Sequence, residues 1–221
     1  MYRIPRIDCN IDCRASLDEA FARTVRETIG CCNWPDRFPY APQAGFRIFH
    51  TGRLLLLRFD VAEACTAALT LDDNGPVWTD SCVEFFFRPE GSGSYYNFEA
   101  NCIGTLLVGH RRDRTHAAHA PEGVLRTIRR SAVYARAALP ERTGDNRWQL
   151  TLVIPAAALF ADRLDGWSGL RGAMNLYKCG DALSQPHYLS WRPIAAPAPD
   201  FHRPEFFEQV LFEPKNDRTL P

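Results

Sequence analysis

Short strand-like segments separated by turn signals run through most of this chain, and they constrain its fold more than any other feature. Each segment is rich in β-branched and aromatic residues and is bounded by Gly, Pro, Asn or Asp. About nine or ten such segments fit this pattern, and no alternation of strands with helices is present. The expected strands include 46–50, 54–61, 82–87, 96–108, 131–139, 147–154, 171–179, 187–192 and 206–213. The pattern predicts an all-β, antiparallel two-sheet β-sandwich with short peripheral helices.

One peripheral helix is expected near the N-terminus. Ser16 and Glu19 have the spacing of a capping box, and apolar residues follow at roughly helical intervals as far as Ile29. We therefore expect a short amphipathic helix or an irregular lead-in over 17–29.

The length of 221 residues suits one domain, which we expect over 1–221 with its core at about 34–213. Basic and acidic residues number 26 each, which argues against a nucleic-acid-binding protein. The longest apolar run, 152–161, contains a proline and is too short to span a membrane. Residues 1–5 lack the apolar core of a signal peptide. The expected compartment is the cytoplasm if this N-terminus is native, and the periplasm or the exterior if a leader was removed.

Eight cysteines are present, and their spacings form no disulfide framework. A chain of this size needs no disulfide bonds, which favours reduced thiols. Cys65, Cys82, Cys102 and Cys179 lie in or beside apolar stretches, where a free cysteine behaves as a small apolar residue. The four cysteines between residues 9 and 32 are poor zinc candidates, because no CxxC pair or nearby histidine accompanies them.

The segment 82–87 carries the most informative polar residue. Alternation along a strand places Val83, Phe85 and Phe87 on one face, which we assign to the core. Glu84 then lies among phenylalanines on the other face of an expected central strand. Because a buried carboxylate without partners is costly, Glu84 needs donors from the protein, a ligand or water.

The next strand continues this polar stripe, with Asn97, Glu99 and Asn101 on one face. Two interpretations stay open: the stripe is a solvated outer face of the sheet, or it lines a pocket for a hydroxyl-rich ligand. Trp78 is either a core residue or an exposed stacking platform. The second interpretation favours the pocket, since sugars present CH faces that pack on aromatic rings and hydroxyl groups that need polar partners.

Trp78 and Glu84 can contact one small ligand only if the chain bends between them. Six extended residue steps span roughly 20 Å, which is longer than one sugar ring. Thr79, Asp80 and Ser81 suit such a bend, because Asp and Ser readily form turns.

A second wall of the site is expected from Lys178, Asp181 and the loop 200–204. Lys178 has two interpretations: it neutralises Glu84 or Glu99, or it forms a structural ion pair. The two glutamates also suit a glycosidase, although GxSxG, HExxH and the phosphate-binding glycine motifs are absent.

Several longer motifs, taken in order, resemble one known family. They are Pro76–Phe86, Tyr95–Glu99 with Asn101–Thr105, Tyr177–Asp181 with Leu189–Trp191, and Pro199–Phe207. These motifs are similar to those of bacterial proteins related to the family 9 carbohydrate-binding module, over residues 34–213. The resemblance implies a non-catalytic β-sandwich in which two tryptophans clasp a terminal sugar and a glutamate bonds its hydroxyl groups.

By this resemblance, Trp78 and Glu84 match the first tryptophan and the glutamate, and Phe201 stands at the position of the second tryptophan. Glu99 stands where an arginine is expected. The type module holds structural calcium, which the resemblance therefore implies without assigning ligands here; no other cofactor is expected. Haem, which related sandwiches bind, is disfavoured because the signature strands hold no histidine and the chain has only two methionines.

Together these observations predict a sugar site in which Trp78 and Phe201 are the stacking platforms. The expected polar contacts are Glu84, Glu99, Asn101 and Lys178, with Asp80 and Asp181 in lesser roles that include shaping turns. The expected partner is a mono- or oligosaccharide in polysaccharide or glycan utilisation, and glycan-degrading enzymes are the proteins such a module would serve. The alternatives are a scaffold or interaction protein with a relic pocket, and a glycoside-active enzyme that uses Glu84 and Glu99.

Overall fold

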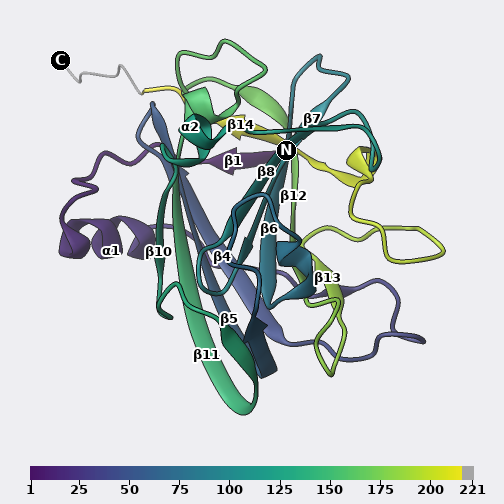
Figure 1. The fold of residues 1–221 in the computed structure, drawn as a ribbon. Helices are drawn as coiled ribbons and strands as arrows, with labels where there is room; N and C mark the ends of the chain where they lie inside the picture. Colours follow the sequence, from purple (N-terminus) through teal and green to yellow (C-terminus); the bar gives the residue numbers. More distant parts are fainter. Residues whose placement is uncertain (216–221) are drawn as a thin grey trace.

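Two β-sheets pack face to face in the computed structural model, which describes residues 1–215 (Figure 1). The larger sheet follows the order β1-β14-β12-β6-β7-β8-β9, with β13 paired to β12 and β3 paired to β13. The smaller sheet follows the order β10-β11-β5-β4-β2. Strand β1 runs parallel to β14, whereas the pairs that build the centre of both sheets are antiparallel. The two-sheet β-sandwich expected from the sequence is confirmed.

The strands of the larger sheet are β1 (Tyr2–Ile4), β3 (Cys31–Cys32), β6 (Cys82–Pro89), β7 (Tyr95–Asn101), β8 (Leu106–Arg111), β9 (Ala117–His119), β12 (Arg171–Cys179), β13 (Tyr188–Ser190) and β14 (Glu208–Phe212). Those of the smaller sheet are β2 (Glu27–Thr28), β4 (Gln43–His50), β5 (Leu54–Ala68), β10 (Arg129–Ala132) and β11 (Leu139–Pro155). The helices are α1 (Arg14–Ala22) and α2 (Glu122–Leu125), with the 3-10 turns η1 (Val77–Thr79), η2 (Ala156–Ala158) and η3 (Pro204–Phe206).

The main core lies between the two sheets, and alternate side chains of β6 point into it, as expected. Val83, Phe85 and Phe87 point into this core, where they meet Phe46 of β4 and Phe59 of β5. Burying a phenylalanine fully stabilises the fold by about 1.5–3 kcal/mol, so the inner face of β6 anchors the sandwich. This anchoring fixes which side chains of β6 face the other way.

The outer face of the larger sheet is covered rather than solvated. Phe86 and Tyr177 form a second core there with side chains from the covering loops. The loop residues that contribute most are Trp34, Ile194, Phe201 and Phe207. Proline-rich loops lie over this face because proline cannot extend a central strand. The polar stripe of β6 and β7 is therefore buried beneath loops, which decides against a solvated face.

The N-terminal region differs from its prediction. Helix α1 begins at Arg14 and ends at Ala22, and the chain then enters β2, where Glu27 pairs with Phe46. The expected capping box does not form, because the Ser16 hydroxyl accepts the Asn10 N–H instead. Ile4 is fully buried in the main core, so the folded core begins well before residue 34.

Two hairpins also differ in detail from the expected strands. The segment expected as one strand over 96–108 is the hairpin β7–β8, with Gly104 at φ +84° in its turn. Conversely, the residues between the strands expected at 131–139 and 147–154 belong to the long strand β11, which keeps its pairing with β5 through shifts of register. Strands β5 and β11 are long, with 15 and 17 residues, and their ends form the lower edge of the molecule in Figure 1.

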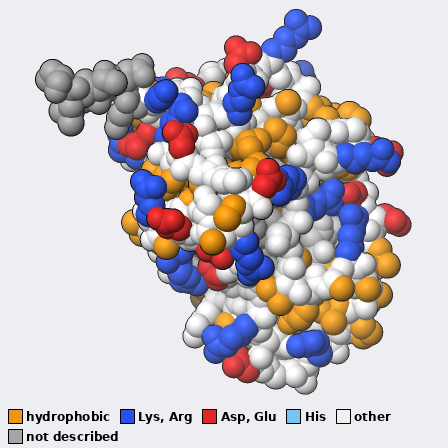
Figure 2. Space-filling view, turned by 90° about the vertical axis from the view of Figure 1, so that its left-hand side faces the viewer, with side chains coloured by type: hydrophobic (Ala, Val, Ile, Leu, Met, Phe, Trp, Pro, Cys, Tyr) orange, Lys and Arg blue, Asp and Glu red, His pale blue; other side chains and the backbone are white. Residues whose placement is uncertain are grey.

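All eight cysteines are free, as the chain size suggested. Among residues 1–215, no helix is both long enough and apolar enough to cross a membrane. The face on the left of Figure 1 carries basic and acidic side chains interspersed, in keeping with equal numbers of the two (Figure 2).

Candidate functional site

A cavity of about 220 Å³ opens on the outer face of the larger sheet, beneath the loops that cover it. Its walls come from β6, β7, β8, β12, η1 and the loop before η3. The lining residues are Trp78, Glu84, Glu99, Arg111, Arg114, Cys179, Asp181, Tyr188, Pro199, Asp200, Phe201 and His202. Five of the predicted site residues meet here: Trp78, Glu84, Glu99, Asp181 and Phe201.

Trp78 reaches the pocket because the chain bends before β6. The bend is the 3-10 turn η1, which starts two residues earlier than the turn expected at 79–81. Backbone bonds tie it to the loop after β12: Asp181 N–H donates to the Trp78 carbonyl at 3.1 Å, and Ala182 N–H to the Thr79 carbonyl at 3.1 Å. The Trp78 side chain stays 38% exposed. An aromatic surface is thus held open to solvent at the pocket rim.

Three carboxyl groups face the same cavity. Glu84 and Glu99 lie directly opposite each other on β6 and β7, each only 3% exposed, and Asp181 follows the end of β12. Within residues 1–215, no basic group lies within 4 Å of these carboxylates. The oxygens of these carboxyl groups can therefore form hydrogen bonds with a ligand.

The pKa of each of these carboxyl groups is raised. Burial, followed by the nearby Cys179 thiol and Glu99, raises the pKa of Glu84 well above its usual range. Burial raises the pKa of Glu99 to about 7, against the opposing effects of Asn97 and Arg111. Burial also raises the pKa of Asp181 to about 6. Near neutral pH the pocket therefore offers carboxyl groups able to donate as well as accept, which matches the chemistry of sugar hydroxyls.

Arg111 is a pocket residue that the sequence did not reveal. Its Nε donates to Asn97 Oδ1 at 3.0 Å, and Asn97 Nδ2 donates to Glu99 Oε1 at 2.6 Å. Gly109 makes this possible, because a Cβ there would lie 2.5 Å from Asn97 Oδ1. The chain of bonds fixes both Arg111 and Glu99 in the pocket wall. Gly109, two residues before Arg111, was the feature of the sequence that could have indicated this. Residues 109–122 are typical of a polar loop, however, so the sequence did not predict that the strand continues to Arg111.

Phe201 forms the opposite wall together with neighbouring aromatic residues. Its ring stacks on Tyr177 with centroids 4.2 Å apart and an interplanar angle of 8°, so one face of the ring is covered. His202 follows it, and the Tyr95 hydroxyl lies 2.9 Å from His202 Nδ1. Burial, with the charges of Arg111 and Arg114, lowers the pKa of His202 to about 3. His202 is therefore a neutral hydrogen-bonding group rather than a cation.

Two of the predicted residues, Asp80 and Asn101, lie outside the pocket. Asp80 accepts the N–H groups of Leu69 at 2.9 Å and Thr70 at 3.0 Å, which is the turn-shaping role considered for it. Asn101 donates to Asp80 Oδ2 at 2.9 Å and is fully buried. The side chains of both residues form hydrogen bonds that close the end of the sheet. Asn101 therefore does not line the pocket, which corrects the sugar contact expected for it.

The expected sugar contact of Lys178 is corrected as well. Alternation along β12 puts Lys178 on the inner face, whereas its neighbours Tyr177 and Cys179 face outward. Lys178 Nζ lies 2.8 Å from Glu63 Oε2 and donates to His187 Nε2 at 2.7 Å, with both ion-pair partners fully buried. The structural ion pair, which was the alternative interpretation of this lysine, is the one observed.

The two carboxyl groups considered for a glycosidase, Glu84 and Glu99, share one wall of the pocket. Glu84 and Glu99 lie side by side on neighbouring strands of one pocket floor. Catalytic carboxylates instead flank the scissile bond from two sides. The fold is a two-sheet β-sandwich with an aromatic-walled pocket whose base carries polar groups, an arrangement that suits a ligand-binding module.

The sequence profile of carbohydrate-binding family 9 matches residues 15–212, and the chain belongs to this family of non-catalytic carbohydrate-binding modules. A candidate carbohydrate-binding protein from Bacteroides uniformis is 38% identical, with a TM-score of 0.90 over 96% of this chain and 98% of that chain. The resemblance seen in the sequence motifs is confirmed. No protein with a curated description matches the sequence.

Two solved family 9 modules from Caldicellulosiruptor kristjanssonii share the fold. The complex with glucose has a TM-score of 0.58 at 9% identity, covering 99% of this chain and 98% of that chain. The complex with cellotriose has a TM-score of 0.57 at 8% identity, covering 100% and 97% respectively. At this identity the likeness concerns the fold alone.

The residues near the pocket do not fit the structural calcium that the resemblance implied. Calcium takes six to eight oxygen ligands. In the part of the chain that the structure describes, potential metal ligands gather at one place, formed by Cys82, Glu84 and Cys179. Two of these three donors are sulfur atoms, so this cluster is not a calcium site, and calcium stays an expectation from the resemblance.

Proposed function

We propose that the pocket binds one sugar ring, from a monosaccharide or from the end of an oligosaccharide. The observation that carries the proposal is the exposed Trp78 ring beside the buried carboxyl groups of Glu84 and Glu99. The exposed carboxyl group of Asp181 lines the same cavity, and none of the three has an ion-pair partner among residues 1–215. A pyranose satisfies both, because its CH face packs on the indole and its hydroxyl groups bond to Glu84, Glu99 and Asp181. Arg111 supplies the donor to a ring or glycosidic oxygen.

The size of the cavity supports a single ring. At about 220 Å³ it lies below the roughly 300–1,000 Å³ of pockets that enclose drug-sized ligands. A longer glycan would therefore enter by one end, with its remaining units outside. The glucose and cellotriose complexes of the Caldicellulosiruptor modules support a hexose as the first ligand to try.

Because Phe201 stands in place of a second tryptophan, we expect a lower sugar affinity than two tryptophans would give. One face of its ring is already stacked on Tyr177, so an edge and the remaining face are left for the sugar. Phenyl also lacks the indole N–H, which removes one donor. The sugar then depends mainly on Trp78 for its apolar contact.

A role in glycan utilisation follows from this site. A non-catalytic module that holds a glycan end serves enzymes that cleave or modify that glycan, and such enzymes are the partners we propose. Eight free thiols support a reducing compartment as its place of action.

Calorimetric titration with a panel of mono- and oligosaccharides tests the proposal, with Trp78→Ala beside the native protein. Losing the indole contact removes about 1.5–3 kcal/mol, or roughly 10–150-fold in affinity. Leu71→Ala is the matched control, because Leu71 is 43% exposed and lies outside the pocket. Absence of heat with every sugar, from folded protein, would favour the scaffold alternative; full affinity in Trp78→Ala would place the site elsewhere.

A further inference from the structure

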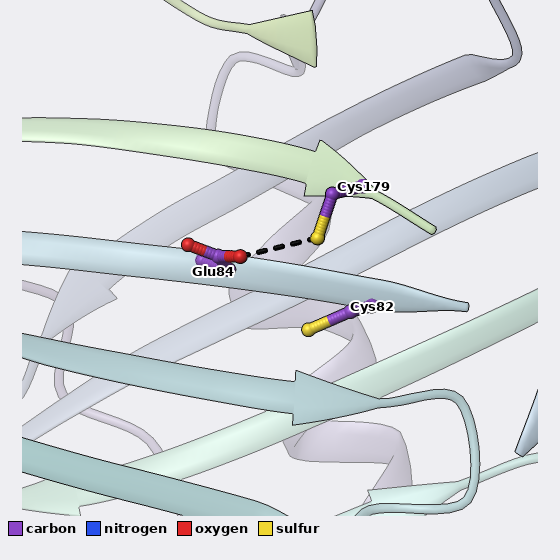
Figure 3. Close-up of side chains that lie close together, drawn as sticks. All are labelled: Cys82, Glu84 and Cys179. Atoms are coloured by element: carbon purple, nitrogen blue, oxygen red, sulfur yellow. Dashed lines mark hydrogen bonds between the residues drawn. The ribbon is translucent and has the colours of Figure 1, made fainter. Parts of the chain in front are cut away.

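Three metal-binding side chains meet at the base of the pocket, in addition to the groups assigned to the sugar (Figure 3). Cys82 and Glu84 are two residues apart on β6 and so share a face, and Cys179 of β12 is the direct cross-strand partner of Cys82. The two Sγ atoms and a Glu84 carboxylate oxygen all lie within 4.8 Å of one another. Register alone therefore brings two thiols and one carboxylate together on a rigid sheet.

Their spacing is close to that of ligands on one zinc ion. Tetrahedral zinc holds sulfur at about 2.3 Å and carboxylate oxygen at about 2.0–2.2 Å, which separates neighbouring ligand atoms by roughly 3.5–4 Å. Cys179 Sγ already lies 3.1 Å from Glu84 Oε1. Small side-chain rotations complete the arrangement, and no backbone change is required.

Charged side chains of both signs line the same cavity. Glu99 and Asp181 favour a cation, whereas Arg111 and Arg114 oppose it; Arg111 Nε is bonded to Asn97, and Lys178 is bound to Glu63 on the other face of β12. A coordinated thiol loses its proton outright, and two thiolates then balance the charge of a divalent cation.

We propose that Cys82, Cys179 and Glu84 bind a thiophilic divalent metal, Zn²⁺ in the first place, with a fourth position open to the pocket. Glu84 and Cys179 line the cavity while Cys82 lies behind them, so water or a sugar hydroxyl has access to that position. Two thiolates with a carboxylate suit zinc and exclude calcium and magnesium as preferred ions. Glu84 would bind through Oε1, which faces Cys179, and keep its second oxygen for the sugar.

Cobalt titration of the full chain, kept reduced and without sugar, tests this proposal independently of the sugar site. We expect one Co²⁺ per chain, a thiolate-to-cobalt charge-transfer band in the near ultraviolet, and displacement of cobalt by Zn²⁺. Cys82→Ser and Cys179→Ser should each weaken binding by more than about 100-fold, since losing even an outer partner of a metal site costs 10–100-fold. Proton release on binding should accompany the band.

The matched control is Cys31→Ser with Cys32→Ser, an adjacent pair of partly buried thiols outside the pocket. This variant should keep the band and the affinity. Glu84→Gln, which preserves shape, covers the case in which a serine variant fails to fold, and should weaken binding while circular dichroism stays native. No thiolate band with folded, reduced protein overturns the proposal. So does a band that survives in the Cys82 and Cys179 variants and disappears in the control pair.

Discussion

Neighbouring residues of β12 present two buried glutamates with opposite environments. On the inner face, Lys178 meets Glu63 of β5; on the outer face, Cys179 meets Glu84 of β6. Trp148 Nε1 and Thr66 Oγ1 donate to Glu63 Oε1 at 2.6 Å and 2.9 Å, and Lys178 Nζ lies 2.8 Å from Oε2. Glu84 has the Cys179 thiol at 3.1 Å and faces the cavity.

The difference separates a carboxylate that serves the fold from one that serves a ligand. Burial alone would raise the pKa of Glu63, but the charge of Lys178 and the bonds from Lys178 and Trp148 hold it below its usual range. The pKa of Glu84 is shifted the other way, because no cation offsets its burial. Burial alone therefore does not mark a functional carboxylate; burial beside a cavity, with no cation paired to it in the described part of the chain, does.

The largest expected effect is on stability at the inner pair. Lys178→Met leaves Glu63 buried without its counter-charge and should lower the free energy of unfolding by about 3–5 kcal/mol in urea titrations. The double variant Lys178→Met with Glu63→Leu removes both charges and should recover most of that loss. A single variant as stable as the native protein would contradict the structural role of this pair.

A smaller effect concerns pH, and the two sites should respond with opposite signs. The folded protein holds protons on Glu99 up to about pH 7 and on Asp181 up to about pH 6, whereas the unfolded chain releases them near 4.5 and 3.8. Their contribution is thus complete below those lower values and is lost as pH rises through 6 and 7, at most about 1.4 kcal/mol per pH unit for each proton. Glu99→Gln should flatten this decline in unfolding free energy measured from pH 4 to 8.

Glu63 should show the reverse dependence. Its pKa is lowered from 4.5 in the folded state, so its contribution is present above that value and is lost as pH falls through the folded-state pKa. Urea titrations at acidic pH should show the loss in native protein. An unchanged acid dependence in Glu63→Gln would count against this assignment.

The smallest expected effect tests the positioning of Arg111. Gly109→Ala puts a Cβ 2.5 Å from Asn97 Oδ1 and disturbs the bonds from Asn97 to Arg111 and Glu99. Losing one such bond costs about 1 kcal/mol, or roughly fivefold in sugar affinity. Gly93→Ala is the matched control, since its Cβ would meet nothing within 4 Å. Equal affinities of the two variants in calorimetry would show that this chain of bonds does not set the site.

The same contrast explains what sequence could and could not predict. The alternation of β6 was readable because Glu84 stands alone among apolar residues, and its face followed directly. Strand β12 is buried on both faces from Gly172 to Cys179. Its apolar and polar residues therefore do not show which side chains face the pocket, and Lys178 was predicted on the wrong face. Arg111 was not predicted as a site residue. It ends β8, which pairs with β9, and because β9 is wholly exposed its sequence did not indicate a strand or a β8–β9 hairpin. Asp80 and Asn101 bond to each other at the open end of the β6–β7 hairpin, a contact between distant residues that no local pattern encodes.

The most direct measurement is the sugar affinity of Glu84→Gln by calorimetry, paired with its unfolding free energy in urea. We expect loss of one strong hydrogen-bonding group to weaken binding by about 1–3 kcal/mol, roughly 5–150-fold. The free energy of unfolding should change by less than about 1 kcal/mol, because the glutamine keeps the shape and Glu84 has no ion-pair partner within residues 1–215. Unchanged affinity, or a stability loss as large as that of Lys178→Met, would show that Glu84 serves the fold as Glu63 does and would contradict the binding role of this pocket.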